Sequence, residues 1–313
     1  MVDSARAVPV SPPPVSSPEG AAAAGGLVAE YDPALVHCPL CGGKDLVFFD
    51  ADFRRHRIDR CGTCGVAFMN PQYSDAHLQR FYSTYISVHD QAAPTPKRRR
   101  SRPEIRAASK ARCLGLMAKH VARGCVLMVG CGDGLELEIA KREGWQPHGY
   151  DIDPATTAAV SARFGVPVHS GRFDELAGIP GGYDGLFMDQ VIEHPKNPAD
   201  YLRHSHRLLR DGGVLFLGTP NTGSLSNRLK TLVGRFGLRP ARRGKHYNTK
   251  HHIFFYTPAV IRGLLERYGF EVLELRGSMK PQLNPVTAVL GRWFPNLDSG
   301  LIAVARKKAG GVG

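Results

Sequence analysis

The stretch from Val126 to Gly134, VLMVGCGDG, constrains the fold of this chain more than any other part of it. Four apolar residues lead into glycines at alternating positions, Gly130, Gly132 and Gly134, and a helix-compatible run follows from Leu135 to Lys141. This pattern predicts a buried strand, a tight turn and the start of a helix. Glycine lets the backbone approach a ligand closely, and a helix N-terminus offers unpaired N–H groups. We therefore expect a nucleoside-sized ligand at this turn.

A second strand, from Trp145 to Tyr150, follows the helix and ends at Asp151. An acidic residue at the tip of the second strand of such a unit can hold both hydroxyls of a ribose. Its separation from Gly130 is the roughly 20 residues that a βαβ unit imposes. The spacing GxGxG resembles motif I of the class I methyltransferases that use S-adenosylmethionine (SAM).

The resemblance continues along the chain. Strands are expected at residues 166–169, 183–191 and 214–217. The second of them begins with the motif YD and is followed by IEHP, and the third lies between the motifs LLRDGG and TPN. The later segments HIFFYT, from His252, and YGFEV, from Tyr268, are similar to the tail of the same subfamily. Over roughly residues 38–307, the chain is identified as a member of the class I SAM-dependent methyltransferases. Its subfamily is related to ubiquinone-type and polysaccharide O-methyltransferases and commonly carries an N-terminal zinc ribbon.

The resemblance implies an α/β fold with a Rossmann-like seven-stranded sheet and a small N-terminal zinc-ribbon module. Residues 271–275 and 301–306 are expected to close one edge of that sheet as an antiparallel pair. Ligands of open parallel sheets bind beyond the carboxyl ends of the strands. The expected cofactor-binding residues are Gly130, Cys131, Gly132, Gly134, Asp151, Ile152, Arg172, Phe173, Asp189 and Gln190.

Met128 departs from the family pattern, which usually has an acidic residue there to help hold the amino group of the cofactor. Three interpretations stay open at this point. SAM binds more weakly, another group such as Glu136 takes over, or catalysis has been lost.

Four cysteines form two CxxC pairs that are separated by 19 residues, CPLC and CGTC. This spacing is typical of a two-knuckle zinc site, whose full set of thiolates makes the metal structural. The alternative is a pair of disulfides or unrelated thiols. The expected ligands are Cys38, Cys41, Cys61 and Cys64, among short strands at residues 46–50, 55–60 and 66–69. Such a small module depends on its metal for stability.

The expected organisation is a disordered tail at residues 1–36, a zinc ribbon at 37–70, a helix and basic linker at 71–103, and the methyltransferase domain at 104–308. An insertion on the acceptor side is expected at 218–256. No apolar run is long enough for a membrane span, and we expect a cytoplasmic protein. The formal charge of +13 favours anionic partners, although solvated surface charge is the simpler explanation.

His194 is the first candidate for a general base, because it follows the fourth strand beside the expected methyl group and imidazole titrates near neutral pH. The alternative is a histidine that orders the loop through a backbone hydrogen bond. His251 and His252 are expected to line the acceptor pocket. Ubiquinone-type relatives carry a second glutamate where this chain has Gln190, and Glu193 is expected to orient the loop. We therefore expect no catalytic magnesium.

Residues 225–250 combine basic side chains with apolar residues at helical spacing. The pattern fits a lid over an anionic acceptor, a helix on an anionic membrane surface, or a lid helix packed on the core. The leading prediction is O-methylation of a small-molecule or glycan acceptor. The alternatives are an RNA methyltransferase whose ribbon recognises substrate, and a non-catalytic SAM-fold binding protein.

Overall fold

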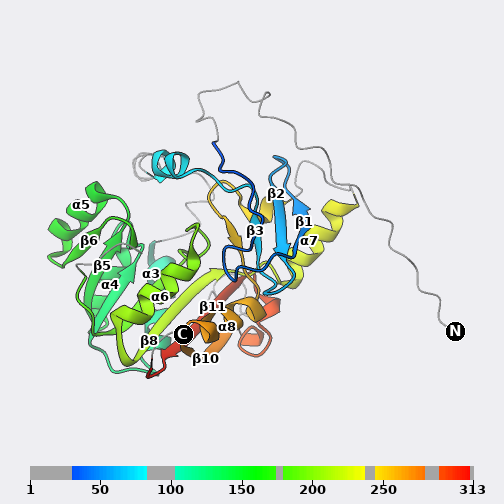
Figure 1. The fold of residues 1–313 in the computed structure, drawn as a ribbon. Coiled ribbons are helices and arrows are strands. Elements are labelled where there is room, and N and C mark those ends of the chain that lie inside the picture. The colour runs from blue at the N-terminus through cyan, green and yellow to red at the C-terminus, as the bar shows by residue number, and fades with distance from the viewer. Residues whose placement is uncertain (1–29, 83–102, 174–178, 237–243, 279–288, 311–313) are drawn as a thin grey trace.

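A computed structural model describes residues 30–82, 103–173, 179–236, 244–278 and 289–310. Of the tail expected at residues 1–36, the first 29 residues lie outside these ranges, whereas Tyr31 pairs with Tyr73 and the Leu35 N–H donates to the Asn70 side chain. Of the helix and basic linker expected at residues 71–103, residues 83–102 lie outside. Two sheets organise the chain (Figure 1). The strands of the larger sheet are β4 (Cys125–Val129), β5 (Gln146–Asp151), β6 (Val168–Ser170), β7 (Tyr183–Asp189), β8 (Leu209–Pro220), β10 (Phe270–Gly277) and β11 (Gly300–Lys307).

The strand order of this sheet is β10-β11-β8-β7-β4-β5-β6. Strands β4 to β8 pair in parallel, whereas β11 runs antiparallel to both of its neighbours, β8 and β10. The predicted class I methyltransferase sheet is therefore confirmed, including its antiparallel edge. The helices that accompany it are α3 (Pro103–Met117), α4 (Leu135–Arg142), α5 (Pro154–Phe164), α6 (Pro198–Leu208) and α8 (Pro258–Arg267).

Strand β4 shows why the sheet is buried on both faces. Val126 and Met128 belong to the core cluster that contains the buried side chains of α3 and α4. Leu127 and Val129, which alternate with them, belong to a second cluster with residues of α6 and α8. All four side chains are at most 3% exposed. A continuous apolar strand is the expected sequence for a parallel sheet that helices cover on both sides.

The smaller sheet joins two distant parts of the chain. Its strands are β1 (Leu46–Ala51), β2 (Arg57–Cys61), β3 (Ala67–Met69) and β9 (Phe254–Phe255), in that order. Phe68 of β3 faces Phe254 of β9, and both rings lie in the core cluster that lines the larger sheet. The sequence predicts the first three strands only. Pairing with β9 satisfies backbone groups of β3 that would otherwise form an open edge.

The remaining helical elements follow β3 and β8 in the chain. Residues 75–82 form a helix, and the Ser74 hydroxyl caps it by accepting a hydrogen bond from the His77 N–H. The others are α7 (Leu225–Arg235), η3 (Lys245–Tyr247) and η4 (Pro295–Leu297). In Figure 1, α7 lies beside the blue strands β1 and β2, at the far side of the molecule from α5 and β6. In the described ranges, every helix is too short or too polar to cross a bilayer.

Candidate cofactor and acceptor site

The glycine turn has the shape that a ligand cradle needs. All three glycines have positive φ angles, 73° at Gly130, 46° at Gly132 and 80° at Gly134, which residues with a side chain rarely adopt. A Cβ on Gly134 would lie 2.3 Å from a ring carbon of Phe164, so glycine is also required there for packing. A Cβ on Gly132 would meet no described atom within 4 Å. The turn is therefore open at Gly132, as close approach of a ligand to the backbone requires.

Asp151 lies beside this open position. Its carboxylate accepts a hydrogen bond of 2.9 Å from the Gly132 N–H, and its side chain is largely buried. Burial raises the pKa of Asp151, and the Gly132 N–H acts in the opposite direction. The next residue, Ile152, is 41% exposed at the end of β5. A carboxylate followed by an exposed apolar side chain fits a ribose and the face of a purine ring, so these residues suit the adenosyl group.

Replacing Asp151 with asparagine is expected to weaken binding of S-adenosylhomocysteine about 30-fold, on the order of 2 kcal/mol, because charge-assisted hydrogen bonds to the ribose are lost. Isothermal titration calorimetry measures this change. Asp153→Asn is the matched control, because that neighbouring carboxylate caps α5 through the Thr156 N–H. It should lower helix stability and leave the affinity within about threefold. Equal affinities for wild type and Asp151→Asn would show that Asp151 does not hold the ligand.

Two of the expected cofactor residues have side chains that point into the core. Phe173 is fully buried and packs against Tyr150 and Tyr201, with ring centroids 4.9 and 5.0 Å apart. Cys131 is 1% exposed, and its sulfur lies against Gly149. Only the backbone of either residue is available to a ligand. The apolar environment explains both cases, since an aromatic ring and a thiol gain more from burial than from a position at the edge of the sheet.

The other expected cofactor residues lie at the ends of strands. Arg172, shortly after β6, and Gln190, directly after β7, are exposed. Gln190 has a positive φ of 60°, and its N–H donates to the Gly218 carbonyl. Asp189 is partly buried at the last position of β7. These residues therefore surround the same carboxyl edge of the sheet as the glycine turn.

Sequence reasoning missed Lys110, which reaches this edge from α3. Its ammonium lies 2.6 Å from an Asp189 carboxylate oxygen and also forms an ion pair with Glu136. Burial disfavours the charge, but the Glu136 and Asp189 carboxylates outweigh it and raise the pKa of Lys110. The available signal was a lysine in the helix that leads into the glycine strand.

The cluster of Lys110, Glu136 and Asp189 lies near Met128, where the family usually has an acidic residue. Met128 is buried, next to Phe187 in the paired strand, and the Lys110 ammonium lies 5.7 Å from the centroid of that ring. Glu136 and Asp189 supply two carboxylates around one ammonium. Negative charge is therefore present near the place that Met128 leaves apolar, which favours the interpretation that Glu136 takes over.

Three histidines converge next to Gln190. His194 comes from the turn after β7, and His251 and His252 come from the segment before β9. Ligating atoms of the three rings lie within 4.8 Å of one another, so the cluster has the dimensions of a metal site. His194 Nδ1 lies 2.9 Å from the His251 carbonyl oxygen. A carbonyl only accepts hydrogen bonds, so Nδ1 carries the proton and Nε2 has the lone pair.

The electrostatic environment keeps His194 and His252 neutral at pH 7. Burial lowers the pKa of His194, against the carbonyls of His251 and Gln190, which raise it. Burial and the neighbouring imidazoles lower the pKa of His252 further. A neutral His194 with a lone pair on Nε2 is in the correct state to accept a proton. The hydrogen bond to His251 also orders the loop, so the two interpretations of His194 are compatible.

Glu193 is 1% exposed beneath the histidines. Its Oε2 accepts a hydrogen bond from the Thr219 hydroxyl, while Oε1 has no hydrogen-bond partner among the described residues and lies 4.0 Å from Nε2 of both His194 and His252. Burial raises the pKa of Glu193 to about 8, so the carboxyl group is protonated at pH 7. Its backbone carbonyl accepts from the N–H groups of Ile253 and Phe254, which agrees with the predicted role in ordering the loop.

This raised pKa makes folding depend on pH. In the unfolded chain the carboxyl group ionises near pH 4.5, so its contribution to stability is complete below that value and is lost as pH rises toward 8. From pH 5 to pH 9, we expect the unfolding free energy of the wild type to fall by on the order of 4 kcal/mol because of this group. The Glu193→Gln variant should not show this loss, because its side chain does not titrate. Urea unfolding at both pH values measures this difference.

Glu138→Gln, which changes an exposed glutamate of α4, is the matched control and should follow the wild type. If Glu193→Gln also follows the wild type, the carboxyl group is ionised in the folded protein and the assignment of its pKa is wrong.

The four ribbon cysteines meet at one point. None of them is in a disulfide in the described structure, and their sulfurs lie within 4.8 Å of one another. The Cys38–Cys64 and Cys41–Cys61 sulfur distances are 3.7 and 3.5 Å. Tetrahedral zinc bonded at about 2.3 Å separates thiolates by roughly 3.8 Å, so the residues fit a zinc ion. Gly42 and Gly65 have positive φ angles after each pair, as the predicted knuckles require.

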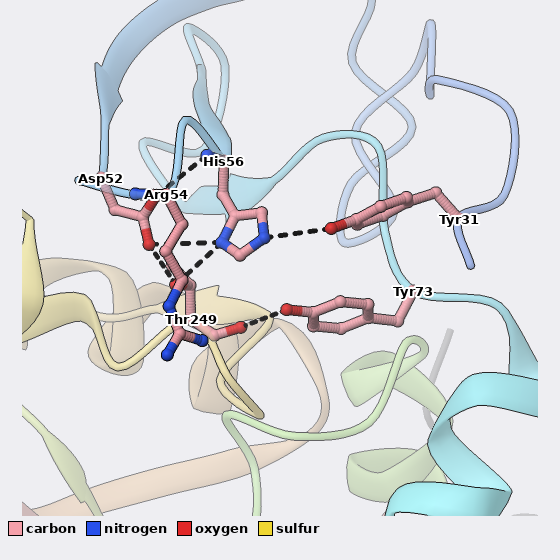
Figure 2. A network of polar contacts seen from close by, with 6 residues as sticks. All are labelled: Tyr31, Asp52, Arg54, His56, Tyr73 and Thr249. Carbon is pink, nitrogen blue, oxygen red and sulfur yellow. Dashed lines mark hydrogen bonds and ion pairs between the residues drawn. The ribbon is translucent and has the colours of Figure 1, made fainter. Parts of the chain in front are cut away.

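A polar network holds the ribbon against the histidine loop (Figure 2). His56 Nδ1 lies 3.2 Å from an Asp52 carboxylate oxygen and 3.0 Å from the Thr249 hydroxyl, and Asp52 also accepts from that hydroxyl. Tyr31 contacts His56 Nε2, and the Tyr73 hydroxyl donates to the Thr249 carbonyl at 2.8 Å. Thr249 stands two residues before His251. Contacts from the ribbon side therefore fix the position of the loop that carries two of the three histidines.

Comparison with known proteins agrees with this geometry. Residues 97–275, more than half of the chain, match the methyltransferase domain family. The chain belongs to this family. The methyltransferase is 32% identical over 158 residues to a ubiquinone biosynthesis O-methyltransferase of Sodalis glossinidius, covering 49% of this chain and 60% of the relative. It is 31% identical to a probable S-adenosylmethionine-dependent methyltransferase of Mycolicibacterium smegmatis, covering 51% of this chain and 57% of the relative. The chain thus spans less than two thirds of the length of these relatives.

Solved structures show the same fold. The methyltransferase is similar to 1,6-didemethyltoxoflavin-N1-methyltransferase of Burkholderia thailandensis, with a TM-score of 0.51, 17% identity and coverage of 84% of this chain and 99% of the other. It is equally similar to magnesium protoporphyrin IX methyltransferase of Synechocystis, with a TM-score of 0.51, 15% identity and coverage of 75% and 100%. Both of those structures contain bound S-adenosylhomocysteine. The class I methyltransferase fold is therefore established for this chain.

Proposed function

We propose that the protein transfers a methyl group from SAM to a hydroxyl group of a small-molecule or glycan acceptor. The observation that carries the proposal is the single edge of the sheet at which the open Gly132 turn, Asp151 and the histidine cluster meet. When bound there, SAM supplies an electrophilic methyl group on a positively charged sulfur. The chain has only to orient the acceptor and receive its proton.

His194 receives that proton in the proposed reaction. The acceptor oxygen attacks the methyl carbon, the carbon–sulfur bond breaks, and the hydroxyl proton moves to Nε2 of His194. The products are a methyl ether, S-adenosylhomocysteine and an imidazolium, which returns its proton to water. His251 and His252 line the acceptor side, and Lys110 with Glu136 and Asp189 forms the charged wall toward the amino-acid end of SAM.

Zinc in the four-cysteine site completes the proposal. The sulfur distances support a structural ion, and a full set of four thiolates leaves no position for water or substrate. The residue boundaries of the ribbon and of the acceptor-side insertion, and the cytoplasmic location, stay predictions.

The test is incubation of the zinc-loaded protein with methyl-labelled SAM and fractionated acceptors, namely hydroxylated aromatics, sugars, polysaccharides and RNA. Label recovered as a methyl ether on a small molecule or glycan supports the proposal. Label recovered on RNA would instead show that the acceptor is RNA. Absence of S-adenosylhomocysteine binding in the same preparation would refute the proposal as a whole.

A further inference from the structure

Helix α7 presents its apolar residues to solvent. Leu225, Leu229 and Leu232 are 64%, 59% and 51% exposed, and Phe236, just after the helix, is 72% exposed. Their spacing of four, three and four residues places them along one face of a helix. An amphipathic helix of a soluble protein normally turns this face toward the core. Here the apolar stripe faces away from the protein.

The inward side of α7 is held by polar contacts. Asn227 is buried, and its side-chain amide donates to the Asn221 carbonyl at 2.9 Å. The Thr231 hydroxyl lies 3.1 Å from Nε2 of His246, which belongs to η3. Ser224 caps the helix through the Asn227 N–H. These contacts fix the rotation of α7, so the outward direction of the leucines follows from the packing of its polar side.

A second exposed apolar segment lies next to α7. Asn221, at the start of the α7 loop, donates from its side chain to the carbonyls of Pro295 and Asp298 at 3.0 Å, and α7 contacts η4. Trp293 and Phe294 directly precede η4 and are 71% and 62% exposed. We call the two segments together the apolar patch; its members are Leu225, Leu229, Leu232, Phe236, Val289, Leu290, Trp293 and Phe294.

The two sequence segments that carry the apolar patch have charged residues of one sign. Residues 222–250 contain eight lysines and arginines and no aspartate or glutamate. Residues 279–294 contain two lysines or arginines and likewise no acidic residue. The chain elsewhere carries 28 acidic residues, so this segregation is local. Arg228, Lys230 and Arg292 are exposed beside the apolar side chains. The surface therefore combines large apolar groups with positive charge.

We propose that the apolar patch docks the protein on the surface of a membrane that contains anionic lipid. Leucine, tryptophan and phenylalanine enter the boundary between headgroups and acyl chains, while flanking lysines and arginines contact the lipid phosphates. A second copy of this chain is a poor occupant, because it would oppose two basic segments that lack acidic partners. Nucleic acid would use the charges but would leave the leucine stripe exposed to water.

The experiment is co-sedimentation of the full-length, zinc-loaded protein with vesicles. We expect binding to vesicles of mixed phosphatidylcholine and phosphatidylglycerol, and at least about tenfold weaker binding to phosphatidylcholine alone. The triple variant Leu225→Ser, Leu229→Ser, Leu232→Ser and the single variant Trp293→Ala should each weaken binding to the anionic vesicles by about tenfold or more. Val47→Ser and Phe48→Ser, which change exposed apolar residues of β1, are matched controls and should bind like the wild type.

Other occupants of the patch give different results in the same set of proteins. Light scattering measures the oligomeric state of each protein. If the wild type is a dimer that does not bind vesicles, and the triple variant is a monomer, the patch binds a second copy of the chain and the proposal is overturned. Equal vesicle binding by patch and control variants would show that general positive charge is responsible, and would overturn it also. S-adenosylhomocysteine affinity reports on folding of each variant.

Discussion

Replacement of Cys61 by serine is expected to remove one zinc ion per chain and to lower methyl transfer at least about 100-fold. Cys61 ends β2 and is fully buried. The sheet that contains it continues through β3 to β9, and the Met69 N–H donates to the carbonyl of Ile253, directly after His252. Loss of the metal therefore disturbs the histidine loop through backbone pairing.

The cofactor turn should tolerate this change better than the acceptor side. It lies between β4 and α4 of the larger sheet, and its hydrogen bonds run to Tyr150 and Asp151 of β5. We expect the affinity for S-adenosylhomocysteine to stay within about threefold of wild type, a difference of under 1 kcal/mol.

Metal analysis, calorimetry and labelled methyl transfer measure the three quantities. Cys125→Ser, at a partly buried thiol outside the ribbon, is the matched control. If Cys61→Ser fails to fold, reversible removal of zinc from the wild type by a chelator gives the same comparison. Full activity in protein without zinc would show that the ribbon does not support the acceptor site.

Replacement of His194 by glutamine is the second large change, with an expected fall in kcat of about 100- to 10,000-fold, the usual contribution of a general base. The glutamine amide can still donate to the His251 carbonyl but cannot take a proton at the position of Nε2. A role limited to ordering the loop would therefore leave most of the activity, whereas a role as base would not.

The pH profile separates the same alternatives. Burial lowers the pKa of His194 below its ordinary value of 6.5, so kcat of the wild type should fall in more acidic solution and be constant from pH 6.5 up to about pH 8, where Glu193 begins to ionise. The glutamine variant should lack this acidic limb. His169→Gln, at a partly buried histidine on β6, is the control and should retain both rate and profile. A kcat within threefold of wild type for His194→Gln would exclude it as the base.

The sequence was sufficient where function depends on short-range geometry. The glycine turn and Asp151 belong to one βαβ unit, so their spacing alone places the Gly132 N–H and the carboxylate together. The cysteine pairs are equally local, because each CxxC turn brings two sulfurs together without help from the rest of the chain. The strand order followed from a family resemblance that rests on several separate motifs.

Long-range contacts were beyond the reach of sequence patterns. The two residues of β9 carry no signal that would pair them with β3, and Lys110 is one of many lysines in the chain. Phe173 was expected at the cofactor site from the family resemblance alone, and its ring packs in the core against Tyr150 and Tyr201. The amphipathic pattern of α7 was visible, whereas the direction of its apolar stripe depends on the polar contacts of Asn227 and Thr231.

The two-residue strand β9 has a consequence for how this protein and its relatives can be recombined. A chimaera that exchanges only the segment before residue 103 would bring a new β3 to an old β9, and the Phe68–Phe254 contact would then join side chains that were not selected together. The ribbon and residues 249–255 form one structural unit, although they are far apart in the sequence. Exchange of acceptor preference between relatives should therefore move both pieces at once.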